Sequence, residues 1–203
     1  MTGSGALGVV LEDARRLGFL GPDPVERHIQ HAEAWAAVLA PGNFLDLGSG
    51  GGVPGLILAE IWPDYPGTLL DSQLRRTAWL RTTVERLGLG SRIRVAEGRA
   101  EDLAHDPELR ERFDLVVSRS FGRPAATAEC GAAYVRVGGI LSVSEPPTSS
   151  IERWPEGELL QLGLSPARQV VHEGATFVIL PKRSASPERF PRRRNRAVRS
   201  PLW

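Results

Sequence analysis

Residues 44–55 have the sequence FLDLGSGGGVPG, in which a short apolar run leads directly into a glycine-rich loop. Such a run, bounded by turn residues, is typical of a buried strand, and glycines allow a ligand to approach the main chain without a Cβ in the way. The next predicted strand ends in Asp71, 23 residues beyond Gly48, close to the ~20-residue spacing at which an acid meets ribose hydroxyls in nucleotide-binding α/β sites. These features predict a ribose-bearing ligand at the carboxyl ends of the strands; the alternative is a structural turn without a ligand.

The order of elements around this loop predicts the fold class. Predicted strands alternate with predicted helices, which indicates βαβ units and a doubly wound α/β sheet that is mostly parallel. After a helix near residues 156–162, two further strands flank Glu173-Gly174 and predict a closing β-hairpin. Seven strands in this order are the layout of the Rossmann-like methyltransferase sheet. The predicted strands are residues 44–47, 67–71, 93–97, 113–118, 140–144, 168–172 and 175–180, and the helices between them are residues 55–62, 73–87, 101–112 and 124–134.

Composition limits the class of protein. The chain has 203 residues, of which 41% are hydrophobic and 24% charged, so it can build one globular core with a small appendage. Its first residues lack a basic region before an apolar stretch, and no apolar run approaches the ~20 residues of a membrane span. We therefore expect a cytoplasmic protein with no membrane partner. The single cysteine, Cys130, excludes an intramolecular disulfide and a multi-cysteine metal site; we expect a buried thiol and no metal.

The charge of the chain is unevenly distributed. Residues 182–199 contain eight basic residues and one acid, a formal charge of +7, whereas the rest of the chain carries −6. A basic segment on an acidic body indicates a polyanionic partner, although a solvated, disordered tail would have the same composition. We expect three segments: N-terminal helices in residues 1–40 (residues 5–17 and 25–40), a main domain in residues 41–183, and an arginine-rich tail in residues 184–203.

The details of the glycine loop select among ribose-bearing ligands. Val53 stands where a dinucleotide loop beginning at Gly48 would have its third glycine, and the loop lacks the lysine of a phosphate-binding P-loop. Asp46, directly before the glycines, brings a carboxylate toward a cationic or amino-bearing ligand. S-adenosylmethionine has a ribose, a sulfonium and an amino acid but no phosphate, so it is the predicted cofactor, and a class I S-adenosylmethionine-dependent methyltransferase is the expected fold class.

Four segments carry a more specific resemblance: DLGSGGGVPGLILA (residues 46–59), LLDSQLRRTAWLRTTVERLGL (69–89), GRAEDL (98–103) and FDLVVSRSFG (113–122). Together they resemble the bacterial glucose-inhibited division protein B family over about residues 26–145, and residues 189–202 are similar to the family's tail. The resemblance implies a methyltransferase that uses S-adenosylmethionine on a guanine N7 of small-subunit (16S) ribosomal RNA. It also implies that the partner is this RNA or the small ribosomal subunit; we expect the enzyme to act as a monomer.

The resemblance also implies roles for individual residues. The glycine loop would line the methionine and ribose part of the cofactor, Asp71 would bind the ribose hydroxyls, and Arg119 would lie at the mouth shared by cofactor and substrate. The tail would bind RNA phosphates, and its removal would leave cofactor affinity unchanged. The loop residues are Gly48, Gly50, Gly52 and Val53; Ala100 and Glu101 would hold the adenine; the tail residues are Arg192, Arg193 and Arg194.

The substrate half departs from the family pattern. His31-Ala32 stand where the family has an acid and a serine, and Ser144-Glu145 stand where it has Lys-Gly. Glu145 beside the mouth would weaken the attraction for RNA phosphate. Two alternatives therefore stay open: a small-molecule methyltransferase that kept the cofactor site, and a non-catalytic RNA-binding factor.

No catalytic base is predicted, because guanine N7 carries a lone pair at neutral pH and transfer then depends on alignment. His28 and His31 lie three residues apart on one predicted helix without a third metal ligand, so we expect ordinary helix-surface residues. Trp35, Trp62 and Trp79 are expected to pack in the core, whereas Trp154 and Trp203 are candidates for stacking on a base.

Overall fold

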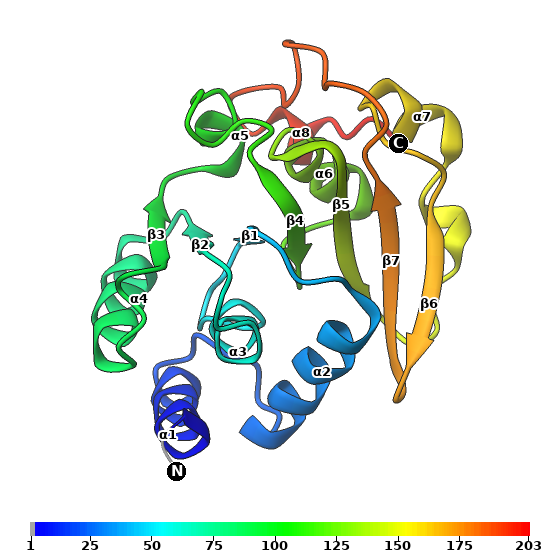
Figure 1. Cartoon of the computed structure of the whole chain (residues 1–203). Helices are drawn as coiled ribbons and strands as arrows, with labels where there is room; N and C mark the ends of the chain where they lie inside the picture. Colours follow the sequence, from blue (N-terminus) through cyan, green and yellow to red (C-terminus); the bar gives the residue numbers. More distant parts are fainter. Residues whose placement is uncertain (1–2) are drawn as a thin grey trace.

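A seven-stranded sheet forms the centre of the molecule, with helices on both faces (Figure 1). The computed structural model describes residues 3–203, with side chains from residue 5 onward. The strand order is β3-β2-β1-β4-β5-β7-β6; β1 to β5 run parallel, and β7 pairs antiparallel with both β5 and β6. The predicted fold class is thereby confirmed. The strands are β1 (Phe44–Leu47), β2 (Gly67–Asp71), β3 (Ile93–Glu97), β4 (Phe113–Ser118), β5 (Val135–Glu145), β6 (Arg168–His172) and β7 (Ala175–Pro181).

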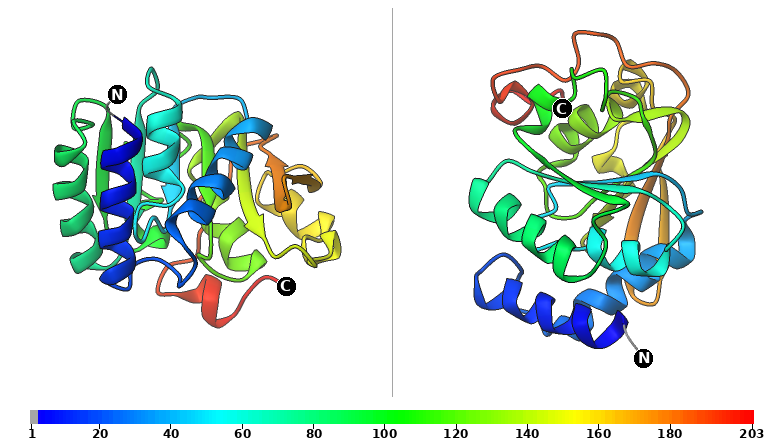
Figure 2. Two further views of the ribbon diagram at one scale, coloured as in Figure 1. Left: turned by 90° about the horizontal axis from the view of Figure 1, so that it is seen from below. Right: turned by 60° about the vertical axis from the view of Figure 1, so that its left-hand side comes forward.

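The helices divide between the two faces, as a doubly wound sheet requires. Figure 2 shows α1 to α4 on one side of the sheet and α5 to α8 on the other. Alternate residues of each strand point to opposite faces, so Phe44 joins the core under the first group while Leu45 joins the core under the second. The helices are α1 (Gly3–Arg16), α2 (Val25–Val38), α3 (Gly55–Ile61), α4 (Leu74–Arg86), α5 (Ala100–Leu103), α6 (Pro124–Ala132), α7 (Glu156–Gln161) and α8 (Arg196–Arg199), with a 3₁₀ helix at Ile151–Arg153.

The two N-terminal helices are built into the first of these cores. Leu7 and Leu11 of α1 and Trp35 of α2 are buried in the same cluster as Phe44. Trp35 stacks on Phe177 of β7 with ring centroids 5.0 Å apart, and its indole nitrogen donates to Ser142 Oγ on β5. Helix α2 is therefore fixed against β5 and β7, which sets where its histidines lie.

Two elements differ from the sequence-based expectation. Helix α5 ends at Leu103, although we predicted a helix through Arg112, because Pro107 lacks a backbone N–H and restricts the residue before it. Strand β5 begins at Val135 rather than Ile140, and its register against β4 shifts around Gly138-Gly139. Both changes lie at the ends of correctly predicted elements.

The arginine-rich tail is packed on the body rather than free. Phe190 and Ala197 are buried in the core beneath α5 to α8, and helix α8 contacts α6. Helix α1 and the C-terminal end of the chain consequently lie on opposite faces of the sheet (Figure 2). Within residues 3–203, none of the helices has both the length and the apolar character needed to cross a membrane.

Candidate active site

Three adjoining hollows lie beyond the carboxyl ends of the parallel strands, next to the point where the strand order reverses between β1 and β4. Ser120, just after β4, lines all three, so they share a common wall. Their volumes are about 360, 270 and 430 Å³. We call them the loop hollow (Gly48–Gly51, Val53, Phe19–Gly21, Asp23, His28, Arg76, Arg119), the carboxylate hollow (Asp71, Ala100, Glu101, Phe121, Cys130 and tail residues) and the hairpin hollow (His31, Arg119, Ser144, Glu145, Arg153, Gly174–Thr176).

The glycine loop forms the floor of the loop hollow. Gly48 has a φ of +77°, and a Cβ there would come within 2.8 Å of the Phe121 ring. Gly50 and Val53 also line this hollow, whereas Gly52 does not: its missing Cβ leaves room for Leu56 of α3. The loop therefore presents bare backbone to a ligand at Gly48 and Gly50 and uses Gly52 to pack against its own helix.

Asp46 braces the loop from behind. Its side chain is fully buried, and its Oδ2 accepts hydrogen bonds from Ser49 Oγ (2.7 Å) and the Gly55 backbone N–H (2.9 Å). Burial raises the pKa of this carboxyl to about 6, against the opposing effect of the two donors. Asp46 lines none of the three hollows. Its place before the glycines predicted direct contact with a ligand, whereas in the structure its side chain holds the loop in position.

Asp71 ties the ends of β1 and β2 together at the carboxylate hollow. One carboxylate oxygen accepts from the Gly50 N–H (3.0 Å) and the other from the Gln73 N–H (2.8 Å). Each oxygen retains a second lone pair, and the side chain is only 5% exposed. The predicted ribose-binding acid is thus held rigidly where it faces the hollow.

Glu101 lies across the carboxylate hollow from Asp71, one residue into α5 after Ala100. Its Oε1 accepts from Arg99 Nε (2.6 Å) and from the backbone N–H of Asn195 in the tail (3.1 Å). The Ala100 carbonyl is anchored by the Tyr134 hydroxyl at 2.6 Å. The structure thus brings Asp71, Ala100 and Glu101, predicted for the ribose hydroxyls and the adenine, together at one hollow, and it adds tail residues that the sequence did not indicate.

Arg119 links the loop hollow to the hairpin hollow. Its Nη2 donates to Nδ1 of His28 at 2.8 Å, and its buried Nη1 has no partner among the described residues. Burial, followed by the charge of Arg119, lowers the pKa of His28, which keeps the imidazole neutral and able to accept this hydrogen bond. His28 is 2% exposed, so the prediction of a helix-surface residue was wrong.

The hairpin hollow holds the residues that depart from the family pattern. His31 Nε2 is 2.9 Å from Ser144 Oγ, and burial lowers the pKa of His31 to about 4. Glu145 is buried and forms an ion pair with Arg153. Arg153 thus offsets the negative charge that Glu145 places beside the mouth.

The predicted RNA-binding arginines separate into two kinds. Arg192 is directed inward and forms a bidentate ion pair with the fully buried Glu129 of α6. Arg193 and Arg194 are exposed and remain candidates for phosphate contact. Trp154 is 3% exposed and so is not free to stack on a base, while the Trp203 indole donates to the Arg153 carbonyl. Cys130 is buried, as predicted.

The residues present fit S-adenosylmethionine. Gly48 and Gly50 line the loop hollow with backbone, and Asp71 faces the adjoining hollow with spare acceptor capacity. The unpartnered Nη1 of Arg119 lies where a ligand carboxylate would satisfy it. Sequence reasoning missed His28, Phe121 and Asn195 as members of the site; of these, only His28 was considered, and then as a helix-surface residue.

Comparison with known proteins identifies the family. Residues 22–150 match the family described as "GidB: rRNA small subunit methyltransferase G". A "Ribosomal RNA small subunit methyltransferase G" of Thermotoga sp. (strain RQ2) is 37% identical over 168 residues, covering 79% of this chain and 72% of the relative. The protein of that name from Deinococcus deserti is 33% identical, covering 78% and 68%.

Solved structures share the fold at low sequence identity. An O-methyltransferase family 2 protein from Planctomyces limnophilus superposes with a TM-score of 0.63 at 14% identity, over 86% of this chain and 62% of that chain. An O-methyltransferase from neocarzinostatin biosynthesis, solved with S-adenosylmethionine, superposes with a TM-score of 0.58 at 20% identity, over 73% and 50%. The predicted methyltransferase class and its S-adenosylmethionine cofactor are confirmed, and the chain belongs to the rRNA small subunit methyltransferase G family.

Proposed function

We propose that this enzyme transfers a methyl group from S-adenosylmethionine to N7 of a guanine in small-subunit ribosomal RNA. The relatives are named for the small-subunit RNA, and the N7 position follows from the sequence resemblance. One observation carries the proposal: Arg119 and Ser120 line both the loop hollow and the hairpin hollow. A cofactor on the glycine loop and an acceptor in the hairpin hollow would therefore meet at these two residues.

The chemistry requires alignment rather than proton removal. S-adenosylmethionine supplies a methyl group on a positively charged sulfur, and an in-line displacement moves that methyl to N7 while the electron pair of the broken C–S bond stays on sulfur. Guanine N7 uses an existing lone pair and loses no proton, so the site needs no general base. Its side chains contribute by fixing the two reactants and excluding water.

The chain's own contacts suit this role. Asp46 and Asp71 hold the glycine loop through backbone N–H groups, which keeps the cofactor floor rigid. Neutral His28 holds the guanidinium of Arg119 at the junction of the hollows. The guanidinium of Arg119 is positively charged and carries paired N–H donors. It can therefore bind a carboxylate, a phosphate or the N7 and O6 acceptors of a guanine.

A second candidate function is methylation of a small molecule, and one observation favours it. Glu145 places a buried carboxylate in the hairpin hollow, balanced by Arg153. A carboxylate accepts hydrogen bonds from amine or hydroxyl groups, so a small polar acceptor without phosphate would also suit this hollow. The enzyme and cofactor would be the same; only the acceptor would differ.

The proposal includes the setting of the reaction. The substrate is the small ribosomal subunit or its RNA, reached in the cytoplasm by a monomeric enzyme that needs no membrane. Exposed arginines of the tail supply the attraction for phosphate, which a polyanionic partner requires.

The test is methyl transfer from labelled S-adenosylmethionine to small ribosomal subunits that lack the modification. A low-molecular-weight cell extract is assayed in parallel, with an Asp71→Ala variant as the cofactor-deficient control. We expect label in the ribosomal RNA at a guanine N7. Label that appears only in the small-molecule fraction would replace this proposal with the second candidate, and label at another atom would overturn the N7 assignment.

A further inference from the structure

The C-terminal strap, which we define as residues 190–203, forms one wall of the carboxylate hollow. Asn195, Ala197 and Val198 line that hollow together with Asp71 and Glu101. Figure 2 shows the strap running along the face of the sheet that α6 covers. We propose that the strap is a cofactor-binding element whose outer face binds RNA phosphate, so that cofactor and RNA bind cooperatively. The RNA part rests on the proposed function.

The strap is seated by a buried ion pair. Glu129 of α6 is fully buried, and both of its carboxylate oxygens are used by Arg192: Oε1 accepts from the backbone N–H (2.7 Å) and Nε (2.9 Å), and Oε2 accepts from Nη2 (2.8 Å). Arg192 Nη2 also donates to the carbonyl of Ser200 at 2.8 Å, which closes the strap into a loop. Phe190 at the start of the strap and Ala197 near its middle are buried. The strap therefore has one defined position.

A turn in the strap brings it to α5. Arg194 and Asn195 both have left-handed backbone conformations, with φ of 61° and 57°, and the Asn195 N–H after this turn donates to Glu101, which lines the same hollow. Without the strap, Glu101 would lose a donor and the hollow would open to solvent on this side. Helix α5 and the strap thus complete the site jointly, in contrast to the expectation that the tail can be removed without effect on cofactor affinity.

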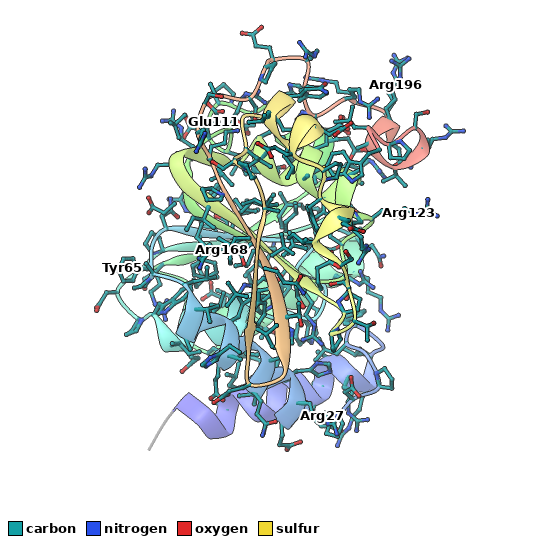
Figure 3. The ribbon with its side chains drawn as sticks, turned by 90° about the vertical axis from the view of Figure 1, so that its right-hand side faces the viewer. Arg27, Tyr65, Glu111, Arg123, Arg168 and Arg196 are labelled. Atoms are coloured by element: carbon teal, nitrogen blue, oxygen red, sulfur yellow. The ribbon has the colours of Figure 1, made fainter. Side chains whose placement is uncertain are left out.

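The outer face of the strap is basic and unpaired. Arg193, Arg194, Arg196 and Arg199 are exposed, and none of them forms an ion pair with any residue that the structure describes. Figure 3 shows Arg196 projecting outward from α8, toward the same side of the view as Arg123. Guanidinium groups recognise phosphate through paired N–H donors. The four side chains give the strap a phosphate-binding face opposite its cofactor-binding face.

The two faces are linked because they belong to one short segment. RNA that contacts the outer arginines stabilises the seated strap and so the closed hollow. By thermodynamic reciprocity, bound cofactor must strengthen RNA binding by the same factor, and couplings of this kind are commonly about 5-fold or more. S-adenosylhomocysteine, the product form of the cofactor, serves as the probe.

The experiment measures the dissociation constant of S-adenosylhomocysteine by calorimetry, with and without a small-subunit rRNA transcript. An inner double variant, Glu129→Gln with Arg192→Gln, removes both members of the ion pair, so neither charge is left buried without a partner. A matched outer variant changes Arg193, Arg194, Arg196 and Arg199 to Gln. Val198→Glu changes an exposed strap residue that lines the hollow and serves as the test if the inner variant does not fold.

We expect the inner variant to weaken cofactor binding about 10-fold, and Val198→Glu to weaken it about 5-fold. The outer variant should keep its RNA-free affinity within about twofold but lose the tightening by RNA, about 5-fold in the unmodified enzyme. It should also reduce the salt dependence of RNA binding. Unchanged cofactor affinity in both the folded inner variant and Val198→Glu would overturn the cofactor role, and RNA that binds without tightening the cofactor would overturn the coupling. Either failure alongside label in the rRNA would leave the proposed function intact.

Discussion

The cofactor half of the site and the acceptor half are held together in different ways. Around the glycine loop, carboxylates accept hydrogen bonds from backbone N–H groups 2 to 21 residues away. Asp46 accepts from Gly55, and Asp71 accepts from Gly50 and Gln73. In the acceptor half and at its junction with the cofactor half, side chains bond to side chains. His28 pairs with Arg119 and His31 with Ser144, 91 and 113 residues apart, and Glu145 pairs with Arg153, eight residues away.

The difference shows which half can change its specificity. Backbone donors are supplied by any residue, so the cofactor half depends on the path of the chain and on few side-chain identities. A side-chain pair changes chemistry when either member is replaced, and the partner must then change as well. Buried atoms without partners among the described residues occur in both halves: Asp46 Oδ1 and Arg76 Nε by the glycine loop, and His31 Nδ1 in the hairpin hollow, with Arg119 Nη1 between them.

The largest expected effect lies in the cofactor half, at Asp71. Asp71→Ala removes the acceptor of two backbone hydrogen bonds and the ribose-facing carboxylate. Hydrogen bonds to charged groups contribute about 1.5–3 kcal/mol each, so we expect the dissociation constant of S-adenosylhomocysteine to rise about 100-fold. Calorimetry measures it directly. Asp64→Ala, an exposed acid before β2, is the matched control and should leave the affinity unchanged; a loss below threefold at Asp71 would remove it from the site.

Arg119 tests whether the two halves are separable, because it borders both. Arg119→Lys keeps the charge but cannot reach His28 and the hollow together. We expect about a 10-fold weaker cofactor affinity and a larger loss of kcat/KM for the acceptor. Calorimetry and labelled methyl transfer separate the two effects. The control is Arg123→Lys, an exposed arginine four residues further along (Figure 3). An effect confined to kcat/KM would assign Arg119 to the acceptor half alone.

The sequence predicted the fold because the fold depends on local patterns. Short apolar strands, glycine and proline boundaries, and the hairpin turn at Glu173-Gly174 are all visible within a few residues. The ends of α5 and β5, which were predicted wrongly, have other causes. Pro107 stopped α5 early, and the pairing of Val135 with Phe113 of β4, across a register shift, was not visible in the sequence that begins β5.

The residues of the candidate site also divide into those that local sequence predicted and those that it did not. Glycine-loop residues and Asp71 were predictable because spacing along the chain sets their positions. His28 was misjudged because its burial depends on Arg119, 91 residues away, and Glu145 because its counter-charge, Arg153, comes from a 3₁₀ helix that no pattern indicated. The inward turn of Arg192 depends on Glu129 of α6, 63 residues away. Long-range side-chain pairs leave no periodic signal in one sequence.

The smallest expected effect concerns the pH dependence of stability in the acceptor half. Burial, then the charge of Arg119, lowers the pKa of His31 from 6.5 to about 4. Between these values the unfolded chain binds the proton and the folded chain does not, so folding loses stability as the pH falls from 6.5 to 4. Because His31 is partly exposed, we expect a loss of about 1 kcal/mol rather than the full shift.

Denaturant unfolding of His31→Gln and the unmodified chain at pH 4.5 and 6.5 measures this loss. The difference between the two proteins is needed because Asp46, with a pKa raised to about 6, loses stability as the pH rises over an overlapping range. Subtraction cancels that opposite slope. Ser144→Ala removes the hydrogen bond but keeps the burial and Arg119, so it should retain most of the slope. If His31→Gln has the same slope as the unmodified chain, His31 is not held neutral by its surroundings, and the acceptor half is more open to water than its pairing indicates.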